Sequence, residues 1–300
     1  MKKVWGITWK IVLWLICCVV LFVFWMSPRL GGVIPIGKDC VDSTIYSLAF
    51  DYDQPAFVTL QYPDLSINKS YSSLRETYNL DSIVQHCESD FEKITAIQSW
   101  VQSRWEHDGE NVPEYHDAAY ILQEAKKGRR FRCVEYATVA QQCLASLGFS
   151  TRQLSLMTRD ISEVKWGGGH VTNEVYIADI SKWVFIDPQY DVITVRNGVP
   201  MNAVELQACI AEGRDFELLN PNNSINKEDY KQWIAPYLYY FTVSLQKGPT
   251  TVWDRIVGNK RQLTLYPVGA AQPMYFQKML RLNTAVYTHA IQAFYPELEQ

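Results

Sequence analysis

The chain has 300 residues, of which 48% are hydrophobic and 20% are charged, and its formal net charge is −4. This composition is typical of a folded protein with a sizeable core, so it excludes an intrinsically disordered chain. The sequence has neither a basic field nor a nucleic-acid-binding motif, which argues against DNA or RNA as a partner.

The first thirty residues differ from the rest of the chain. Lys2, Lys3 and Lys10 precede an uncharged run over residues 11–26. Its length lies between a signal-peptide core and a full membrane span, and no small-x-small cleavage pattern follows it. We therefore predict an uncleaved signal anchor, one transmembrane helix over residues 1–29. Because the lysines lie on its N-terminal side, the rest of the chain is expected outside the cytoplasm, at the cell membrane.

Four segments are predicted after the anchor. They are a stalk over residues 30–45, an N-terminal extension over 46–84, a main domain over 85–200 and a C-terminal extension over 201–300 that packs on the main domain. The stalk is rich in proline and glycine. Residues 44–46 and 57–60 are β-like runs. The aromatic stretch 237–241 fits either a strand or a helix.

The main domain is predicted to begin with helices and to continue with strands. Ser89 followed by Glu92 forms a capping box, and apolar residues then recur at helical spacing as far as Trp105. The other predicted elements are helices over 117–127 and 133–148 and strands over 152–158, 170–178 and 182–187. This order predicts an α+β fold with an antiparallel sheet.

Cys133 is the best nucleophile candidate in the sequence. It begins a helix directly after Arg129, Arg130 and Arg132, and both the helix dipole and nearby cations favour a thiolate. The alternative for an isolated cysteine is a small core residue, and Cys143 on the same helix keeps that interpretation.

His170 and Asp187 are the candidate partners of this thiol. His170 follows three glycines and shares a strand face with Thr172 and Glu174, opposite the apolar face, so it can face a cleft. Asp187 ends the next apolar strand, where a carboxylate needs a partner. A hairpin centred between residues 178 and 179 places the two residues directly opposite each other, and a centre one or two residues later makes the pairing diagonal or bulged.

These three residues imply acyl-transfer chemistry. Cys133 attacks an acyl carbon, His170 moves the proton, and Asp187 holds the imidazole in its tautomer and orientation. The backbone N–H at the start of the helix is expected to face the developing oxyanion.

Three further residues are predicted to contact the substrate: Trp166, Gly169 and Glu174. Core packing is the alternative for the tryptophan, and a surface salt bridge is the alternative for the glutamate. His107 and His116, each followed by an aspartate, match no standard zinc spacing, so we predict neither a metal nor a cofactor. Cys40 and Cys87 could form a disulfide in an oxidising exterior.

The sequence around the three candidate residues resembles that of the transglutaminase-like superfamily. FRCVEYA at 131–137, continued by LASLGFSTR at 144–152, resembles its nucleophile helix. GHV at 169–171 with EVY at 174–176, followed by WVFIDP at 183–188, resembles its histidine and aspartate strands. The resemblance covers residues 85–200. It implies a papain-like core in which the nucleophile helix packs on an antiparallel sheet.

Together these expectations describe a membrane-anchored, extracytoplasmic cysteine enzyme that acts by thioester chemistry on the peptide or amide bonds of a protein or peptide. The resemblance favours hydrolysis over cross-linking. A transamidase that joins glutamine and lysine side chains is the close alternative. From another class, the alternative is a non-catalytic binding or scaffolding module at the cell surface, which an unreactive, buried Cys133 would support.

Overall fold

The computed structural model of the chain describes residues 2–26, 38–55, 69–245, 260–273 and 285–298. The β-like run predicted at 57–60 and most of the predicted stalk lie outside these residues. The β-like run predicted at 44–46 is wrong, because these residues belong to no strand.

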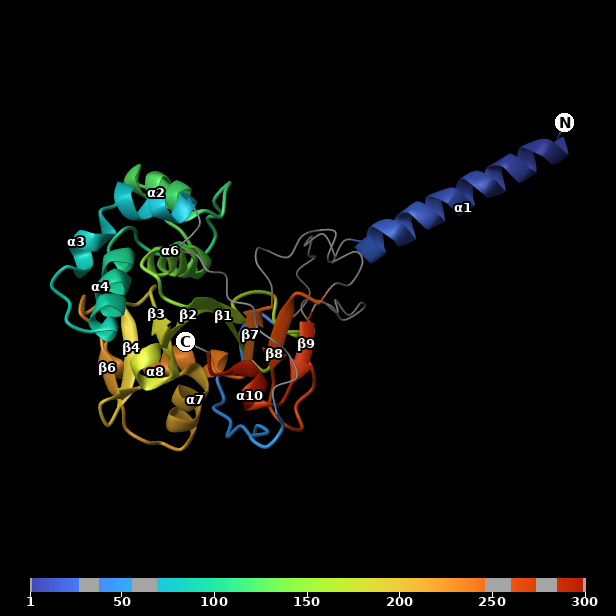
Figure 1. Cartoon of the computed structure of the whole chain (residues 1–300). Helices are drawn as coiled ribbons and strands as arrows, with labels where there is room; N and C mark the ends of the chain where they lie inside the picture. The colour runs from blue at the N-terminus through green and yellow to red at the C-terminus, as the bar shows by residue number, and fades with distance from the viewer. Residues whose placement is uncertain (1, 27–37, 56–68, 246–259, 274–284, 299–300) are drawn as a thin grey trace.

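A nine-stranded sheet lies at the centre of the molecule (Figure 1). Its order is β5-β4-β3-β2-β1-β7-β8-β9, and β6 pairs with β4. The strands are β1 (Thr151–Met157), β2 (Gly169–Ile177), β3 (Lys182–Asp187), β4 (Val192–Arg196), β5 (Val199–Pro200), β6 (Glu217–Leu219), β7 (Tyr240–Ser244), β8 (Gln262–Leu265) and β9 (Ala285–Thr288). All described strand pairs are antiparallel except β8 with β9. The predicted α+β class with an antiparallel sheet is therefore confirmed.

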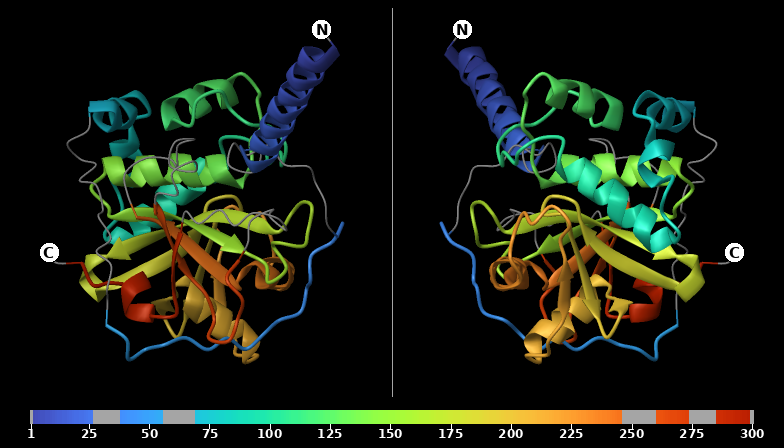
Figure 2. Two further views of the ribbon diagram at one scale, coloured as in Figure 1. Left: turned by 90° about the vertical axis from the view of Figure 1, so that its right-hand side faces the viewer. Right: turned by 90° about the vertical axis from the view of Figure 1, so that its left-hand side faces the viewer.

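Five helices form a layer on one face of this sheet, as Figure 2 shows. They are α2 (Lys69–Thr77), α3 (Leu80–Val84), α4 (Asp90–Gln102), α5 (Ala118–Lys126) and α6 (Cys133–Ser146). The Ser89 side chain accepts a hydrogen bond from the Glu92 backbone N–H at 3.2 Å, which confirms the predicted start of α4. Trp105 lies beyond the end of that helix, which is shorter than predicted. Asp117 caps α5 in the same way, by accepting from the Tyr120 N–H at 3.1 Å.

The core between this helical layer and the sheet is aliphatic. Fully buried residues of the helices include Ile94, Ile97 and Leu144, and they meet Val175 and Ile186 from the sheet. Each such side chain contributes roughly 1.5–3 kcal/mol relative to an exposed one. The nucleophile helix predicted from Cys133 is therefore held firmly on the sheet.

The opposite face of the sheet is covered by the part of the chain beyond residue 200. The helices there are α7 (Ala203–Ala211), α8 (Lys227–Ile234) and α10 (Ile291–Phe294), with the 3₁₀ turn η2 (Ala235–Tyr237). These elements and the sheet enclose a second core, which contains the fully buried residues Leu156, Phe185, Tyr230 and Phe241. The aromatic stretch 237–241, predicted as either a strand or a helix, contains the last residue of η2 and the first two residues of β7. Since β7, β8 and β9 extend the same sheet, this C-terminal part is continuous with the main domain.

The N-terminal helix α1 (Lys2–Met26) lies apart from the rest of the molecule in Figure 1. Its large apolar side chains between Trp9 and Phe22 are exposed. Among the residues with a described structure, no helix combines the length and the apolar character that a membrane span needs. The transmembrane helix therefore stays a prediction.

Candidate active site

The hairpin of β2 and β3 brings His170 and Asp187 to one face of the sheet. The two strands pair with Asn173 opposite Ile186, and this register places Asp187 opposite Thr172. The hairpin is centred one residue later than the symmetric alternative, on the turn η1 (Ala178–Ile180). His170 lies two residues from Thr172 and so points to the same face. The diagonal pairing is thus the alternative that the structure confirms.

The imidazole and the carboxylate are in hydrogen-bond contact inside the protein. His170 Nε2 lies 2.9 Å from Asp187 Oδ2, and the Gln189 backbone N–H donates to Oδ1 at 3.2 Å. His170 is 2% exposed and Asp187 is fully buried. Because Nε2 is bound to the carboxylate, Nδ1 is the ring nitrogen that remains for the thiol.

Cys133 is the first residue of α6 and lies over the start of β2. The Asn173 side-chain amide donates to the Ala137 carbonyl at 3.0 Å, which ties the first turns of α6 to this strand. The thiol lies within hydrogen-bond reach of His170 and of the Val171 backbone N–H. Cys133 as a residue is partly exposed.

The pKa values of the thiol and the imidazole are shifted toward an ion pair. Burial raises the pKa of Cys133, but the hydrogen bond and positive charge of His170, followed by the Val171 N–H, outweigh it and lower the pKa overall. Burial lowers the pKa of His170, but the charge and hydrogen bond of Asp187, with a smaller contribution from Cys133, raise it to about 10. Both shifts therefore favour a thiolate beside an imidazolium over the neutral pair.

The three arginines before Cys133 are not among the largest contributions to this shift, which come from burial and from His170. Each has its own carboxylate partner: Arg129 pairs with Glu124 at 3.2 Å, Arg130 with Glu106 at 2.8 Å and Arg132 with Glu135 at 2.8 Å. Glu135 is fully buried and pairs with Arg132, the arginine next to Cys133 in the sequence.

Aromatic side chains from the C-terminal part surround the imidazole, and the sequence reasoning missed them. The ring centroids of His170 and Trp233 are 4.7 Å apart at 79°, and those of His170 and Tyr237 are 6.1 Å apart. Tyr190 packs on Trp233 at 4.5 Å. Tyr230, Trp233 and Tyr237 follow helical spacing, the only sequence signal that could have placed them on one face. They cover the strand face on which the histidine was expected to meet an open cleft.

The three residues predicted to contact the substrate lie in different surroundings. Trp166 is 65% exposed, four residues before the histidine. Gly169 is exposed at the start of β2, opposite Met157. Glu174 is fully buried and bonds to Arg152 at 2.6 Å, so its carboxylate has no exposed surface from which to contact a substrate. Of the three, Glu174 is the one that is not exposed.

The glycine run before His170 has a structural reason. A Cβ on Gly168 would lie 2.7 Å from both Ile161 Cδ1 and Val164 Cγ2. The Gly168 carbonyl accepts from the Thr158 N–H at 2.9 Å. The glycine run thus allows the preceding loop to pack closely against the start of the strand.

The other chemical candidates of the sequence form no second centre. Cys40 and Cys87 are both free thiols, so the possible disulfide between them is not formed. In the described ranges, no three His, Cys, Asp or Glu side chains are grouped as metal ligands. The side chain of His107 has an exposed edge, but the surrounding protein partly desolvates the ring, and this desolvation lowers its pKa. The positive charge of His170 lowers it further, so the two rings are near each other.

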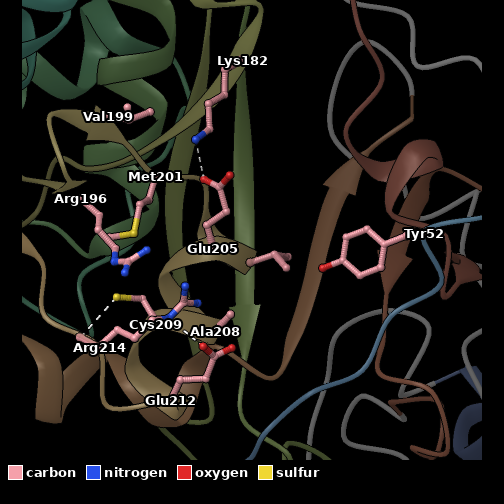
Figure 3. A pocket seen from close by; sticks show the side chains of 11 residues that line it. Tyr52, Lys182, Arg196, Val199, Met201, Glu205, Ala208, Cys209, Glu212 and Arg214 are labelled. Carbon is pink, nitrogen blue, oxygen red and sulfur yellow. Dashed lines mark hydrogen bonds and ion pairs between the residues drawn. The ribbon is translucent and has the colours of Figure 1, made fainter.

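A separate pocket of about 410 Å³ lies beside α7 (Figure 3). Arg196, Cys209 and Arg214 lie close together on one wall, where Figure 3 shows them facing the pocket, and Tyr52 stands on the other side. Neither the thiol of Cys133 nor its partners line this pocket. It is therefore distinct from the candidate site at Cys133, His170 and Asp187.

The model of the transglutaminase-like superfamily matches residues 79–188, a segment that contains all three candidate residues. Three solved structures show weak likeness. A proposed cysteine protease from Cytophaga hutchinsonii has a TM-score of 0.34 and 16% identity, over 52% of this chain and 52% of that one. A proposed protease from Parabacteroides distasonis has a TM-score of 0.30 and 13% identity, over 41% and 24% of the two chains.

Red sea bream transglutaminase has a TM-score of 0.32 and 14% identity, over 58% of this chain and 31% of that one. The chain thus spans about half the length of the first of these proteins and less of the other two. No curated protein is significantly similar to it. The sequence resemblance and the family model agree, and the chain contains a transglutaminase-like superfamily domain over residues 79–188.

Proposed function

We propose that this chain is a cysteine enzyme that acts on peptide or amide bonds through a thioester. Cys133 is the nucleophile, His170 the general acid and base, and Asp187 the group that orients the imidazole. One observation carries the proposal: a buried imidazole joins the carboxylate at 2.9 Å and contacts a partly exposed thiol whose pKa is lowered.

The reaction then proceeds in two halves. The Cys133 thiolate attacks the carbonyl carbon, and the imidazolium of His170 protonates the leaving amine as the C–N bond breaks. In the second half the neutral imidazole takes a proton from water, which attacks the thioester and releases the acid and the thiolate. Asp187 keeps Nδ1 of the imidazole directed at the sulfur throughout, because it holds Nε2.

Two donors are candidates for the oxyanion. One is the backbone N–H of Cys133 at the start of α6, where the helix dipole is favourable. The other is Trp105 Nε1, a buried donor without a hydrogen-bond partner in the described part of the chain. The Trp105 ring stacks on Tyr136 in the first turn of α6, with centroids 4.4 Å apart.

The first test is the pH dependence of Cys133 alkylation by iodoacetamide in the full chain, read by mass spectrometry, with Cys143 as an internal control. Burial raises the pKa of Cys143, so this cysteine is expected to stay unmodified in the folded protein. Cys133 is expected to react well below pH 8 and to lose that reactivity in His170→Ala. If Cys133 alkylates only after unfolding, the enzyme proposal fails and the binding-module alternative takes its place.

The second test separates hydrolysis from transamidation. A peptide library containing glutamine is incubated with the protein, with and without a labelled primary amine. We expect hydrolysis that Cys133→Ala abolishes without changing the circular dichroism spectrum. Incorporation of the amine instead of release of the acid would assign the second half of the reaction to an amine acceptor.

We further propose that α1 anchors the domain in the cell membrane with the domain outside the cytoplasm, where it meets protein or peptide substrates. The support is the uncharged run with its preceding lysines, together with exposed apolar side chains such as Trp14 and Leu21 on that helix. Fractionation of cells that express the full chain, compared with a variant lacking residues 2–26, tests the anchor. Recovery of the full chain in the soluble fraction would contradict it, and protection of the domain from protease added to intact spheroplasts would contradict the orientation.

A further inference from the structure

The Asp187 carboxylate receives a third donor from outside the family-matched segment. The Tyr230 hydroxyl donates to Asp187 Oδ2 at 2.9 Å, the same oxygen that His170 Nε2 contacts. Tyr230 lies in α8, well beyond residue 188, and is fully buried. The oxygen that orients the imidazole is thus held from two sides.

The hydroxyl is suited to this position because it remains protonated, and so a donor, at pH values where a free tyrosine would ionise. Burial, and then the negative charge of Asp187, raises the pKa of Tyr230 well above its ordinary value. An ionised carboxylate is acceptor-only, so the Tyr230 hydroxyl must donate to it. With the Gln189 N–H on the other oxygen, the plane of the carboxylate is determined by its contacts.

The same helix also shields the His170–Asp187 contact from water. Trp233 lies one turn after Tyr230, with its ring edge-on to the imidazole. Tyr190 and Tyr237 pack against Trp233 with centroid distances of 4.5 and 5.3 Å. A charged hydrogen bond is stronger when water is excluded, because the local dielectric is lower.

We propose that Tyr230 is a positioning residue for the thiol site and acts through Asp187, with Trp233 as the shield of the pair. This inference rests on the proposed function. It makes the C-terminal part of the chain necessary for the site, because the family-matched segment by itself contains neither residue. Removing the hydroxyl leaves the charge of Asp187 less compensated, which raises the pKa of both Cys133 and His170, so this charge effect alone does not set the sign. The expected rise in the pKa of Cys133 follows from geometry: the carboxylate loses a contact that fixes its orientation, so it holds the imidazolium that lowers the pKa of the thiol less well.

The test is the pH midpoint of Cys133 alkylation by iodoacetamide in the full chain, compared among the wild type, Tyr230→Phe and Tyr240→Phe. Tyr240→Phe is the matched control, since it also removes a buried hydroxyl bond, to the Ala271 carbonyl at 2.8 Å, but away from Asp187. We expect Tyr230→Phe to raise the midpoint by about half a pH unit, which is about three-fold less thiolate below the midpoint. Tyr240→Phe is expected to leave it unchanged.

Trp233→Phe is a second variant, which replaces Tyr230→Phe in the test if the latter folds poorly. Its position is partly exposed, so the substitution is expected to disturb folding less. We expect it to raise the midpoint as well, because entering water screens the imidazolium. Unchanged midpoints in both variants, or an equal rise in Tyr240→Phe, would overturn the inference while the proposed function stands. A wild-type Cys133 with the midpoint of a free thiol, insensitive to His170→Ala, would overturn both.

Discussion

The buried ion pair of Arg152 and Glu174 gives the sharpest stability prediction. Glu174 Oε2 accepts from Arg152 Nη2 at 2.6 Å and from Nε at 3.0 Å, with side chains 5% and 0% exposed. Glu174 Oε1 accepts from the Tyr295 hydroxyl at 2.7 Å and from the Ala203 N–H at 3.1 Å. Arg152 also donates to the Phe294 carbonyl at 2.7 Å. One carboxylate therefore joins the sheet to α7 and to the C-terminal segment.

Glu174→Ala is expected to lower the free energy of unfolding by about 3–5 kcal/mol, the usual cost of leaving a buried charge without its partner. The upper part of this range applies because two further donors lose their acceptor. A native stability of about 5–15 kcal/mol makes such a loss large. Tyr295→Phe keeps the ion pair and loses one hydrogen bond to a charged group, so it is expected to cost about 1.5–3 kcal/mol.

Urea unfolding followed by circular dichroism measures both variants, with Glu106→Ala as the matched control. Glu106 pairs with Arg130 at 2.8 Å, but the two side chains are 75% and 58% exposed, so its removal is expected to cost about 1 kcal/mol or less. The slope of the transition should stay constant, so that the midpoint reports stability alone. If Glu174→Ala and Glu106→Ala lower the free energy of unfolding by the same amount, the Glu174 carboxylate does not join the sheet to α7 and the C-terminal segment in the way that its contacts indicate.

Three other predictions test the site and its support. In Cys133→Ala, the pKa of His170, measured by NMR titration, is expected to fall below about 10 but to stay above 6.5, because the thiol contributes only part of the upward shift; an unchanged value would separate the two residues. Gly168→Ala is expected to lower stability by about 1–3 kcal/mol through overpacking against side chains at 2.7 Å, whereas Gly109→Ala, with its nearest neighbour at 3.7 Å, should be close to neutral. Arg130→Ala is expected to leave the alkylation midpoint of Cys133 unchanged. A rise of the midpoint would indicate that the positive charge of Arg130 stabilises the thiolate.

The elements of the main domain could be predicted because their signals are local. The cap at Ser89, the periodic helix after it and the alternation along the two strands each depend on residues within one or two turns or a single strand. The position of His170 relative to Asp187 needed only the length of one hairpin turn, which is also local. Their contact was therefore available from the sequence to within one residue of register.

The covering of the site could not be predicted because it depends on contacts across the chain. Tyr230 meets Asp187 across 43 residues, and Arg152 meets Phe294 across 142. Helical spacing of aromatic residues says that a helix has an aromatic face, but not which strand that face covers. The burial of Glu174 was missed for the same reason, since its partners come from three separate elements.

The lowered pKa of Cys133 was predicted from the helix dipole and the adjacent arginines, whereas its largest lowering contribution comes from His170, and the reason is physical. Arginines adjacent in sequence are close to the sulfur along the chain, but each is also close to a carboxylate, and a paired cation has little charge left to act at a distance. His170 is 37 residues away in the sequence, yet it is desolvated, held by Asp187 and in contact with the sulfur. The strength of an electrostatic effect on a thiol thus follows the burial and the pairing of its neighbours. For this reason the variants that matter for its reactivity lie at His170, Asp187 and Tyr230 rather than in the basic run.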